Sequence, residues 1–170
     1  LREHEEDNVF AVHVTAGTTN YGIVDDIAGV VEVAKERGIW VHVDGAYGLA
    51  AAAVPGVAHL FAGLERASSV SVDAHKWMYL PKACGVVLVR RRADLEAAFL
   101  HEEAYFPHER NQPHAVDITL EYSRPFRALK LWLAFRAHGA DAVLGRIRFT
   151  DDLGAAADFL AAPVMLGFMN

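Results

Sequence analysis

Short runs of apolar and β-branched residues alternate along the chain with longer stretches in which apolar residues recur every three or four positions. The first run, at residues 9–15, is nearly continuous in apolar residues, which is typical of a strand buried on both faces of a sheet. Similar runs at residues 39–44, 69–73 and 85–91 predict three further strands. Because helix-length segments separate the first three runs, we expect an α/β fold with a mainly parallel sheet and flanking helices.

Helical periodicity fills the intervals between the predicted strands. After Asp26, apolar residues at positions 27, 30, 31 and 34 form one stripe, and Gly38 can end this helix. A second helical segment is expected at residues 57–66. These two segments supply the crossovers that parallel strands require.

The character of the sequence changes after residue 100. Residues 101–121 are polar and contain two prolines, which predicts a long loop. Ser123 can then cap a helix with Pro125 in its first turn, and Gly139 can end that helix. A last helix is expected from about residue 140 to residue 161.

Composition and charge narrow the kinds of protein that this chain can come from. Of its 170 residues, 53% are hydrophobic and 22% are charged, which is enough apolar material for one sizeable core. The net charge of −6 argues against nucleic-acid binding, because phosphate contacts need clustered Lys and Arg. No apolar run reaches the roughly 20 residues that cross a bilayer, and the acidic opening segment lacks the layout of a secretory signal. The single cysteine, Cys84, suits a reducing compartment, so we expect a soluble cytoplasmic protein.

Three loops that follow predicted strands carry polar residues suited to catalysis. These loops are residues 15–22, 44–47 and 73–77, and open α/β sheets bind ligands beyond the carboxyl ends of their strands. We therefore expect the loops to lie side by side. Together they offer hydroxyls, a carboxylate and a lysine beside a histidine. A pyridoxal site requires this set: an amine to form an imine, a carboxylate to keep the pyridine nitrogen protonated, and polar groups for the ring hydroxyl and the phosphate.

Four ordered segments make this interpretation more specific. They are residues 15–22 (TAGTTNYG), 41–48 (VHVDGAYG), 72–77 (VDAHKW) and 123–132 (SRPFRALKLW). With these segments in this order, the chain closely resembles the group II pyridoxal-phosphate-dependent amino-acid decarboxylases, from about residue 8 to residue 160. That family includes the aromatic amino-acid, tyrosine, histidine and glutamate decarboxylases. The resemblance implies pyridoxal 5'-phosphate as the cofactor and part of an aspartate-aminotransferase-like large domain (PLP fold type I).

The resemblance also assigns roles to individual residues. Lys76 matches the imine-forming lysine, and Asp44 matches the carboxylate that pairs with the pyridine nitrogen. Ala46 matches the small residue on one cofactor face, Thr19 a threonine near the ring substituents, and His75 a histidine beside the phosphate. The predicted catalytic residues are Lys76, Asp44 and His75, and the predicted cofactor-binding residues are Lys76, Asp44, Ala46, Thr19, His75 and Asp73.

The nine histidines of the chain do not indicate a metal site. No pair of them has ligand spacing within a shared helix or a CxxC context, so no metal is predicted. His42 shares a strand face with Trp40 and Asp44, because side chains alternate along a strand. We interpret His42 as a core histidine whose hydrogen bonds are satisfied.

The resemblance implies a division of the chain into three segments. Residues 1–100 would form the second half of the cofactor-binding large domain, residues 101–122 a long active-site loop, and residues 123–170 a helical segment leading to a small domain beyond this chain. Because the chain begins with Leu1 rather than methionine, we expect upstream sequence. In the family that upstream region carries the histidine that stacks on the cofactor and the residues that anchor its phosphate. The active site of this fold lies at a two-fold interface, so a homodimer is also expected.

The expected reaction is decarboxylation of an L-amino acid through a Lys76 imine. Tyr47 and Trp77 resemble the aromatic-type members, which favours an aromatic substrate. Two alternatives stay open: another enzyme of the same fold, such as an aldehyde synthase or a transaminase-like enzyme, or an inactive truncated fragment. The aldehyde alternative arises because the loop tyrosine that donates a proton in related decarboxylases has no clear counterpart. The candidates for that donor are Tyr105, Tyr122, His108 and His114.

Overall fold

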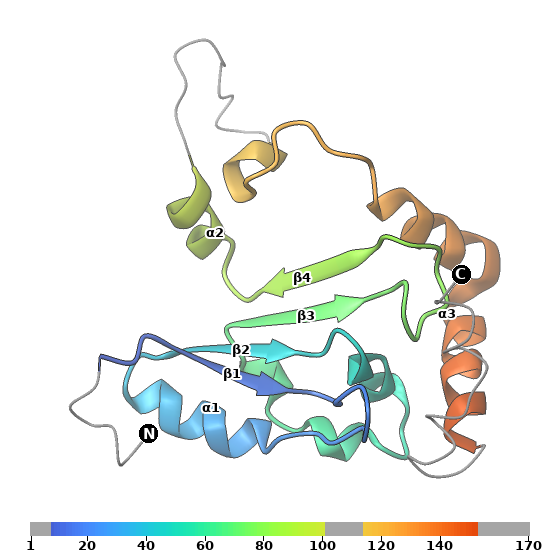
Figure 1. The fold of residues 1–170 in the computed structure, drawn as a ribbon, viewed down its shortest axis with the longest axis horizontal. Helices are drawn as coiled ribbons and strands as arrows, with labels where there is room; N and C mark the ends of the chain where they lie inside the picture. Colours follow the sequence, from blue (N-terminus) through green and yellow to red (C-terminus); the bar gives the residue numbers. More distant parts are fainter. Residues whose placement is uncertain (1–7, 101–113, 153–170) are drawn as a thin grey trace. The chain divides into compact units, whose positions relative to one another are not determined.

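The computed structural model describes residues 8–100 and 114–152, and the side chains of the second range as far as residue 147. These described residues form four strands, three α-helices and several short 3-10 helices, arranged as in Figure 1. In chain order they are β1 (Ala11–Thr15), α1 (Ile27–Glu36), β2 (Trp40–Asp44), η2 (Gly48–Ala53), η3 (Ala58–Phe61), η4 (Leu64–Arg66), β3 (Ser69–Asp73), β4 (Gly85–Val89), α2 (Arg92–Phe99), η5 (Ala115–Ile118) and α3 (Ala128–Asp152).

The four strands form one sheet in the order β1-β2-β3-β4. β1 pairs in parallel with β2, and β2 pairs in parallel with β3, so the expected mainly parallel sheet is confirmed. β4 runs in the opposite direction to β3 (Figure 1). The reason is that no helix lies between these two strands, and a parallel pair needs a crossover of a dozen or more residues.

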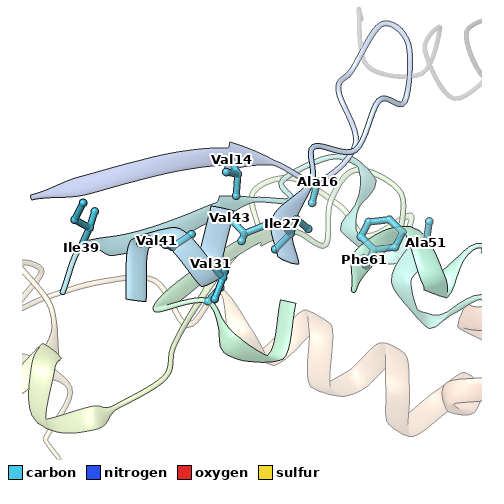
Figure 2. Packing of buried hydrophobic residues seen from close by; sticks show 11 residues of the cluster. Val14, Ala16, Ile27, Val31, Ile39, Val41, Val43, Ala51 and Phe61 are labelled. Carbon is cyan, nitrogen blue, oxygen red and sulfur yellow. The ribbon is translucent and has the colours of Figure 1, made fainter. Parts of the chain in front are cut away.

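The main core lies between the sheet and α1. Ile27 and Val31 of α1 pack against Val14, Val41 and Val43 of the first two strands (Figure 2). Ile27 is 1% exposed and Val43 is fully buried, so each contributes about 1.5–3 kcal/mol through the hydrophobic effect.

The ends of α1 follow from local sequence. The side chain of Asp26 accepts a hydrogen bond from the backbone N–H of Gly29 at 2.9 Å, which satisfies one of the free donors at the helix start. Gly38 adopts a φ of 65° just beyond the last turn. The predicted boundaries of this helix are confirmed.

The opposite face of the sheet is polar. The strand register aligns His13 with His42 and His42 with Ser69, and it aligns Asp44 with Ser71. Register partners in neighbouring strands share a face, so these side chains point away from α1. The prediction that β1 is buried on both faces is therefore wrong within the described residues, where the side chain of His13 is 58% exposed. The polar residues at alternate positions of β1 explain this one-sided burial.

Two predicted helices differ from the structure. Residues 57–66 form the 3-10 helices η3 and η4 rather than one α-helix, because Gly63 between them has a φ of 90°. Ser123 was expected to cap a helix with Pro125 in its first turn, but α3 begins later, at Ala128. Gly139 interrupts α3 with φ 75° and ψ 164°, at the residue where a helix was predicted to end. The part of the predicted last helix beyond residue 152 lies outside the described residues.

α2 is an element that sequence periodicity did not indicate. Its start is held by ion pairs between Arg91 and Asp94 at 2.6 Å and between Arg92 and Glu96 at 2.6 Å. The described residues between 89 and 126 form a compact unit in which α2 packs against η5. The remaining described residues form the other unit, which contains the core and the three loops considered next.

Candidate active site

The three loops that follow β1, β2 and β3 are joined by backbone hydrogen bonds at one edge of the sheet. The N–H of Ala16 donates to the carbonyl oxygen of Asp44 at 2.7 Å, and the N–H of Gly45 donates to that of Ser71 at 3.0 Å. The N–H of Asp73 donates to the carbonyl oxygen of Ala46 at 3.1 Å. The loops therefore lie side by side, as the positions of their strands predicted.

Two glycines allow the first loop to pack closely against Gly48, the residue that follows the second loop. A Cβ atom added to Gly17 would lie 2.6 Å from the Cα of Gly48, and one added to Gly48 would lie 2.7 Å from the carbonyl oxygen of Ala16. Gly17 also has a φ of 94°, a conformation that other residues rarely adopt. Only glycine at both positions allows the two backbones to approach this closely.

Asp44 is held at the carboxyl end of β2 as an oriented carboxylate. Its Oδ1 accepts hydrogen bonds from the backbone N–H of Ala46 at 2.9 Å and from the Ser71 hydroxyl at 3.2 Å. Its Oδ2 lies 3.6 Å from Nε2 of His13. The Ala46 N–H lowers the pKa of Asp44 most, and Ser71 and His13 lower it further, against the opposing effect of partial burial. The carboxylate is therefore ionised at neutral pH.

Lys76 lies in the turn that follows β3. Its Nζ is 2.9 Å from Oδ2 of Asp73, and its backbone N–H donates to the carbonyl oxygen of Asp73 at 3.0 Å. Nε2 of His75 lies 3.9 Å from the same Oδ2. Gly85 leaves room for this carboxylate, because a Cβ there would lie 2.9 Å from Oδ1 of Asp73. Asp73 was predicted to bind the cofactor. In the structure the Lys76 ammonium and the His75 imidazole both lie near its Oδ2.

The tautomer of a neutral His75 ring follows from its hydrogen bond with Cys84. The backbone N–H of Cys84 donates to Nδ1 of His75 at 3.1 Å, so the proton of a neutral ring must be on Nε2. That proton is on the side of Asp73. Cys84 itself is a buried free thiol.

Two aromatic side chains connect the second loop to the third. The rings of Tyr47 and Trp77 stack with centroids 6.2 Å apart and an interplanar angle of 21°. Burial raises the pKa of Tyr47, and the charge of Tyr79 raises it further, so the Tyr47 hydroxyl stays protonated. This stacking links the loop that contains Asp44 to the loop that contains Lys76.

Thr19 is less closely associated with this cluster than the other predicted residues. It lies exposed in its turn, while the neighbouring Thr18 closes that turn by accepting a hydrogen bond from the N–H of Ile23 at 3.1 Å. Within residues 8–100, no hydrogen bond joins Thr19 to Asp44 or Lys76. The loop candidates Tyr105 and His108 lie outside the described residues.

The sequence reasoning missed His13, Ser69 and Ser71. Each lies at an alternate strand position on the same face as His42 and Asp44. The available signal was the period of two, which places polar residues of neighbouring strands together once the register is known.

A comparison with known protein families identifies the chain. Residues 1–156 match the pyridoxal-dependent decarboxylase conserved domain, and the chain belongs to this family. It is 34% identical over 150 residues to the L-tyrosine/L-DOPA decarboxylase 2 of Lophophora williamsii. That alignment covers 86% of this chain and 29% of the relative, so the chain spans less than a third of the relative's length.

Solved structures agree with this assignment. The crystal structure of Oryza sativa TDC with PLP and tryptamine is 32% identical, with a TM-score of 0.76 over 81% of this chain and 29% of that one. The Rhodiola rosea 4-hydroxyphenylacetaldehyde synthase is also 32% identical, with a TM-score of 0.71 over 82% of this chain and 28% of that one. The expected fold, as part of a larger domain, is confirmed. Among the described residues, no helix combines the length and the hydropathy needed to span a membrane.

Proposed function

We propose that the native protein carrying this chain, called the parent protein below, removes the α-carboxylate of an L-amino acid with the help of pyridoxal phosphate. The observation that carries this proposal is the pairing of an ionised, oriented carboxylate at Asp44 with an amine at Lys76. Both lie on neighbouring loops of one sheet edge in a member of the decarboxylase family. Lys76 is the residue proposed to hold the cofactor covalently.

The chemistry of the donor set fits pyridoxal phosphate. Asp44 has an ionised carboxylate, which favours a protonated ring nitrogen, and its Oδ1 is already fixed by two donors. Ala46 presents only a methyl group beside this carboxylate, which leaves space for a flat ring. Once bound, the cofactor supplies an electron sink for the bond that breaks at the substrate α-carbon.

The residues around Lys76 are suited to hold and release a charged amine. Asp73 binds the lysine ammonium at 2.9 Å in a half-buried position, where the ion pair is partly shielded from water. His75 presents its Nε2 proton on the same side. We therefore assign Asp73 and His75 to orienting Lys76 and to the polar end of the cofactor, with Thr19 near the ring substituents.

An aromatic substrate is the proposed specificity. The support is the stacked pair Tyr47 and Trp77 beside the site, together with the names of relatives that act on L-tyrosine and L-DOPA. We further propose that the parent protein is a cytoplasmic homodimer, in which residues 101–122 form an active-site loop and residues 123–170 lead to a further domain.

A second candidate function is aldehyde synthesis on the same site. It is favoured by the likeness to the Rhodiola rosea 4-hydroxyphenylacetaldehyde synthase, which matches this chain as well in identity as the Oryza sativa protein does. The two functions differ in product: decarboxylation releases carbon dioxide and an amine with no oxidant, whereas aldehyde synthesis would consume dioxygen and release carbon dioxide, ammonia, hydrogen peroxide and an aldehyde. A transaminase-like activity would yield neither carbon dioxide nor an aldehyde of this kind.

The test uses the parent protein with L-tyrosine, L-DOPA and L-tryptophan as substrates. Borohydride reduction followed by peptide mass spectrometry should find the cofactor on Lys76. Lys76→Ala should abolish this adduct and lower kcat by a factor on the order of 10³ or more. Lys35→Ala, on the exposed surface of α1, is the matched control and should leave both unchanged. An adduct on another lysine would refute the assignment, and product analysis separates amine from aldehyde. The 170-residue chain tested alone shows whether this part suffices for activity.

A further inference from the structure

The imidazole of His13 lies beside the site and has no role in the function proposed above. It projects from β1 onto the polar face of the sheet, where it aligns with His42 of β2. Its Nε2 is 3.6 Å from Oδ2 of Asp44. His13 is therefore in contact with the carboxylate oxygen that Ala46 and Ser71 leave open.

The hydrogen-bonding capacity of Asp44 defines what this contact can do. An ionised carboxylate has about four acceptor positions, two on each oxygen. Ala46 and Ser71 occupy the two positions of Oδ1. Nε2 of His13 lies 3.6 Å from Oδ2, just beyond direct hydrogen-bonding distance, so it acts on this oxygen by electrostatic attraction and leaves the acceptor positions of Oδ2 open to a ligand. We propose that His13 is a positioning residue that orients Oδ2 of Asp44, so that an open acceptor position of this oxygen would face the ring nitrogen of the cofactor. This inference rests on the proposed function.

The side chain of His13 is itself supported by a hydrogen-bonded series on β2 and β3. Its ring stacks on that of His42 with centroids 5.9 Å apart and an interplanar angle of 27°. Nδ1 of His42 lies 2.8 Å from the Ser69 hydroxyl, which also accepts the indole N–H of Trp40 at 2.9 Å. The indole can only donate, so the Ser69 hydroxyl can still either donate its own hydrogen to Nδ1 of His42 or accept one from it, depending on the tautomer of His42. His42 is thereby fixed, and it supports His13 from one side.

The electrostatics agree with this role. Burial lowers the pKa of His42, His13 lowers it further, and Asp44 opposes both, so His42 stays neutral at physiological pH. Because His42 is neutral, the negative charge of Asp44 interacts mainly with the ring N–H of His13, which lies 3.6 Å from Oδ2. His13 is also among the groups that lower the pKa of Asp44.

The test measures cofactor affinity in the parent protein for variants that separate the donor from the ring. His13→Phe keeps a ring for stacking and removes the donor, whereas His13→Gln keeps an N–H near the position of Nε2. Since both side chains of the pair are more than a third exposed, His13→Phe should weaken cofactor binding only about three- to tenfold. His13→Gln should stay within about twofold of wild type. His59→Phe, an exposed histidine on η3, is the matched control and should change nothing.

A double-mutant cycle with Asp44→Asn distinguishes positioning from a general structural effect. If His13 acts through the Asp44 carboxylate, His13→Phe should weaken binding less than about twofold in the Asp44→Asn background. An equal loss in both backgrounds, or an equal loss for His13→Phe and His13→Gln, would overturn the inference while leaving the proposed function intact. A wild-type protein that binds no cofactor would refute the proposed function and the inference with it. If His13→Phe does not fold, His13→Leu takes its place in the cycle.

Discussion

Replacing Gly17 with alanine should destabilise the parent protein more than replacing either Gly38 or Gly48 with alanine. At Gly17 an alanine meets two separate penalties. Its φ of 94° is unfavourable for an L side chain by about 1–2 kcal/mol. Its Cβ would also lie 2.6 Å from the backbone of Gly48, an overlap that costs about 1–3 kcal/mol. The expected sum is therefore about 2–5 kcal/mol.

Two control substitutions isolate these penalties. Gly38 has a φ of 65° and no atom within 4 Å of an added Cβ, so Gly38→Ala should show only the backbone term. Gly48 is not among the glycines with positive φ, and an added Cβ there would lie 2.6 Å from the Cα of Gly17, so Gly48→Ala should show only the overlap. The loss for Gly17→Ala should approach the sum of the two losses, provided that the loops do not move.

Urea unfolding followed by tryptophan fluorescence gives the three free-energy changes, and a cofactor titration gives the functional counterpart. Gly17→Ala and Gly48→Ala should weaken cofactor binding, because both separate the loop of Thr19 from the loop of Asp44. Gly38→Ala should not weaken it. If Gly17→Ala is no more destabilising than Gly38→Ala, the loops are not in close contact and the reasoning fails.

Three further predictions concern charge and packing. The pKa of Asp44 is lowered on folding, so its stabilising effect is complete above the ordinary value of 3.8 and is lost as pH falls through the lower folded value. Asp44→Asn should therefore reduce the fall in unfolding free energy between neutral pH and about pH 3, and unchanged acid sensitivity would contradict this. Ile27→Ala should cost about 2–5 kcal/mol in urea unfolding, because the side chain is 1% exposed; a loss below about 1 kcal/mol would mean that α1 is not packed as described. Glu32→Gln should change stability by less than about 1 kcal/mol, since its ion pair with Arg66 at 2.7 Å lies in solvent. A larger change would show a role beyond the surface pair.

Helix and strand boundaries could be predicted where they depend on residues close by in the sequence. The boundaries of α1 were predictable because Asp26 and Gly38 act locally. α2 was not, because ion pairs stabilise its start and it buries no apolar stripe. The break at Gly63 depends on tertiary structure: an added Cβ there would lie 2.6 Å from the Cα of Ala28 in α1, so the close approach of two distant segments requires glycine.

The site shows the same limit. Lys76 and Asp44 lie in continuous motifs, so the order of residues along the chain is enough to predict a role for each of them. His13 belongs to no motif, and its relation to Asp44 depends on the register between β1 and β2. Asp73 was expected to face the cofactor, and the sequence could not indicate that it pairs with Lys76 across a single turn.

The hydrogen bond from Cys84 to His75 has a consequence for how this region can vary. Together with the bond from the N–H of Ala74 to the carbonyl oxygen of Cys84, it joins the start and the end of the segment that connects β3 to β4. Changing the length of a flexible segment whose ends are already joined costs little, about 0.6 kcal/mol for each doubling. Side-chain changes at the exposed residues 81–83 should therefore leave Lys76 in its place, because the two hydrogen bonds fix the segment on both sides of these residues.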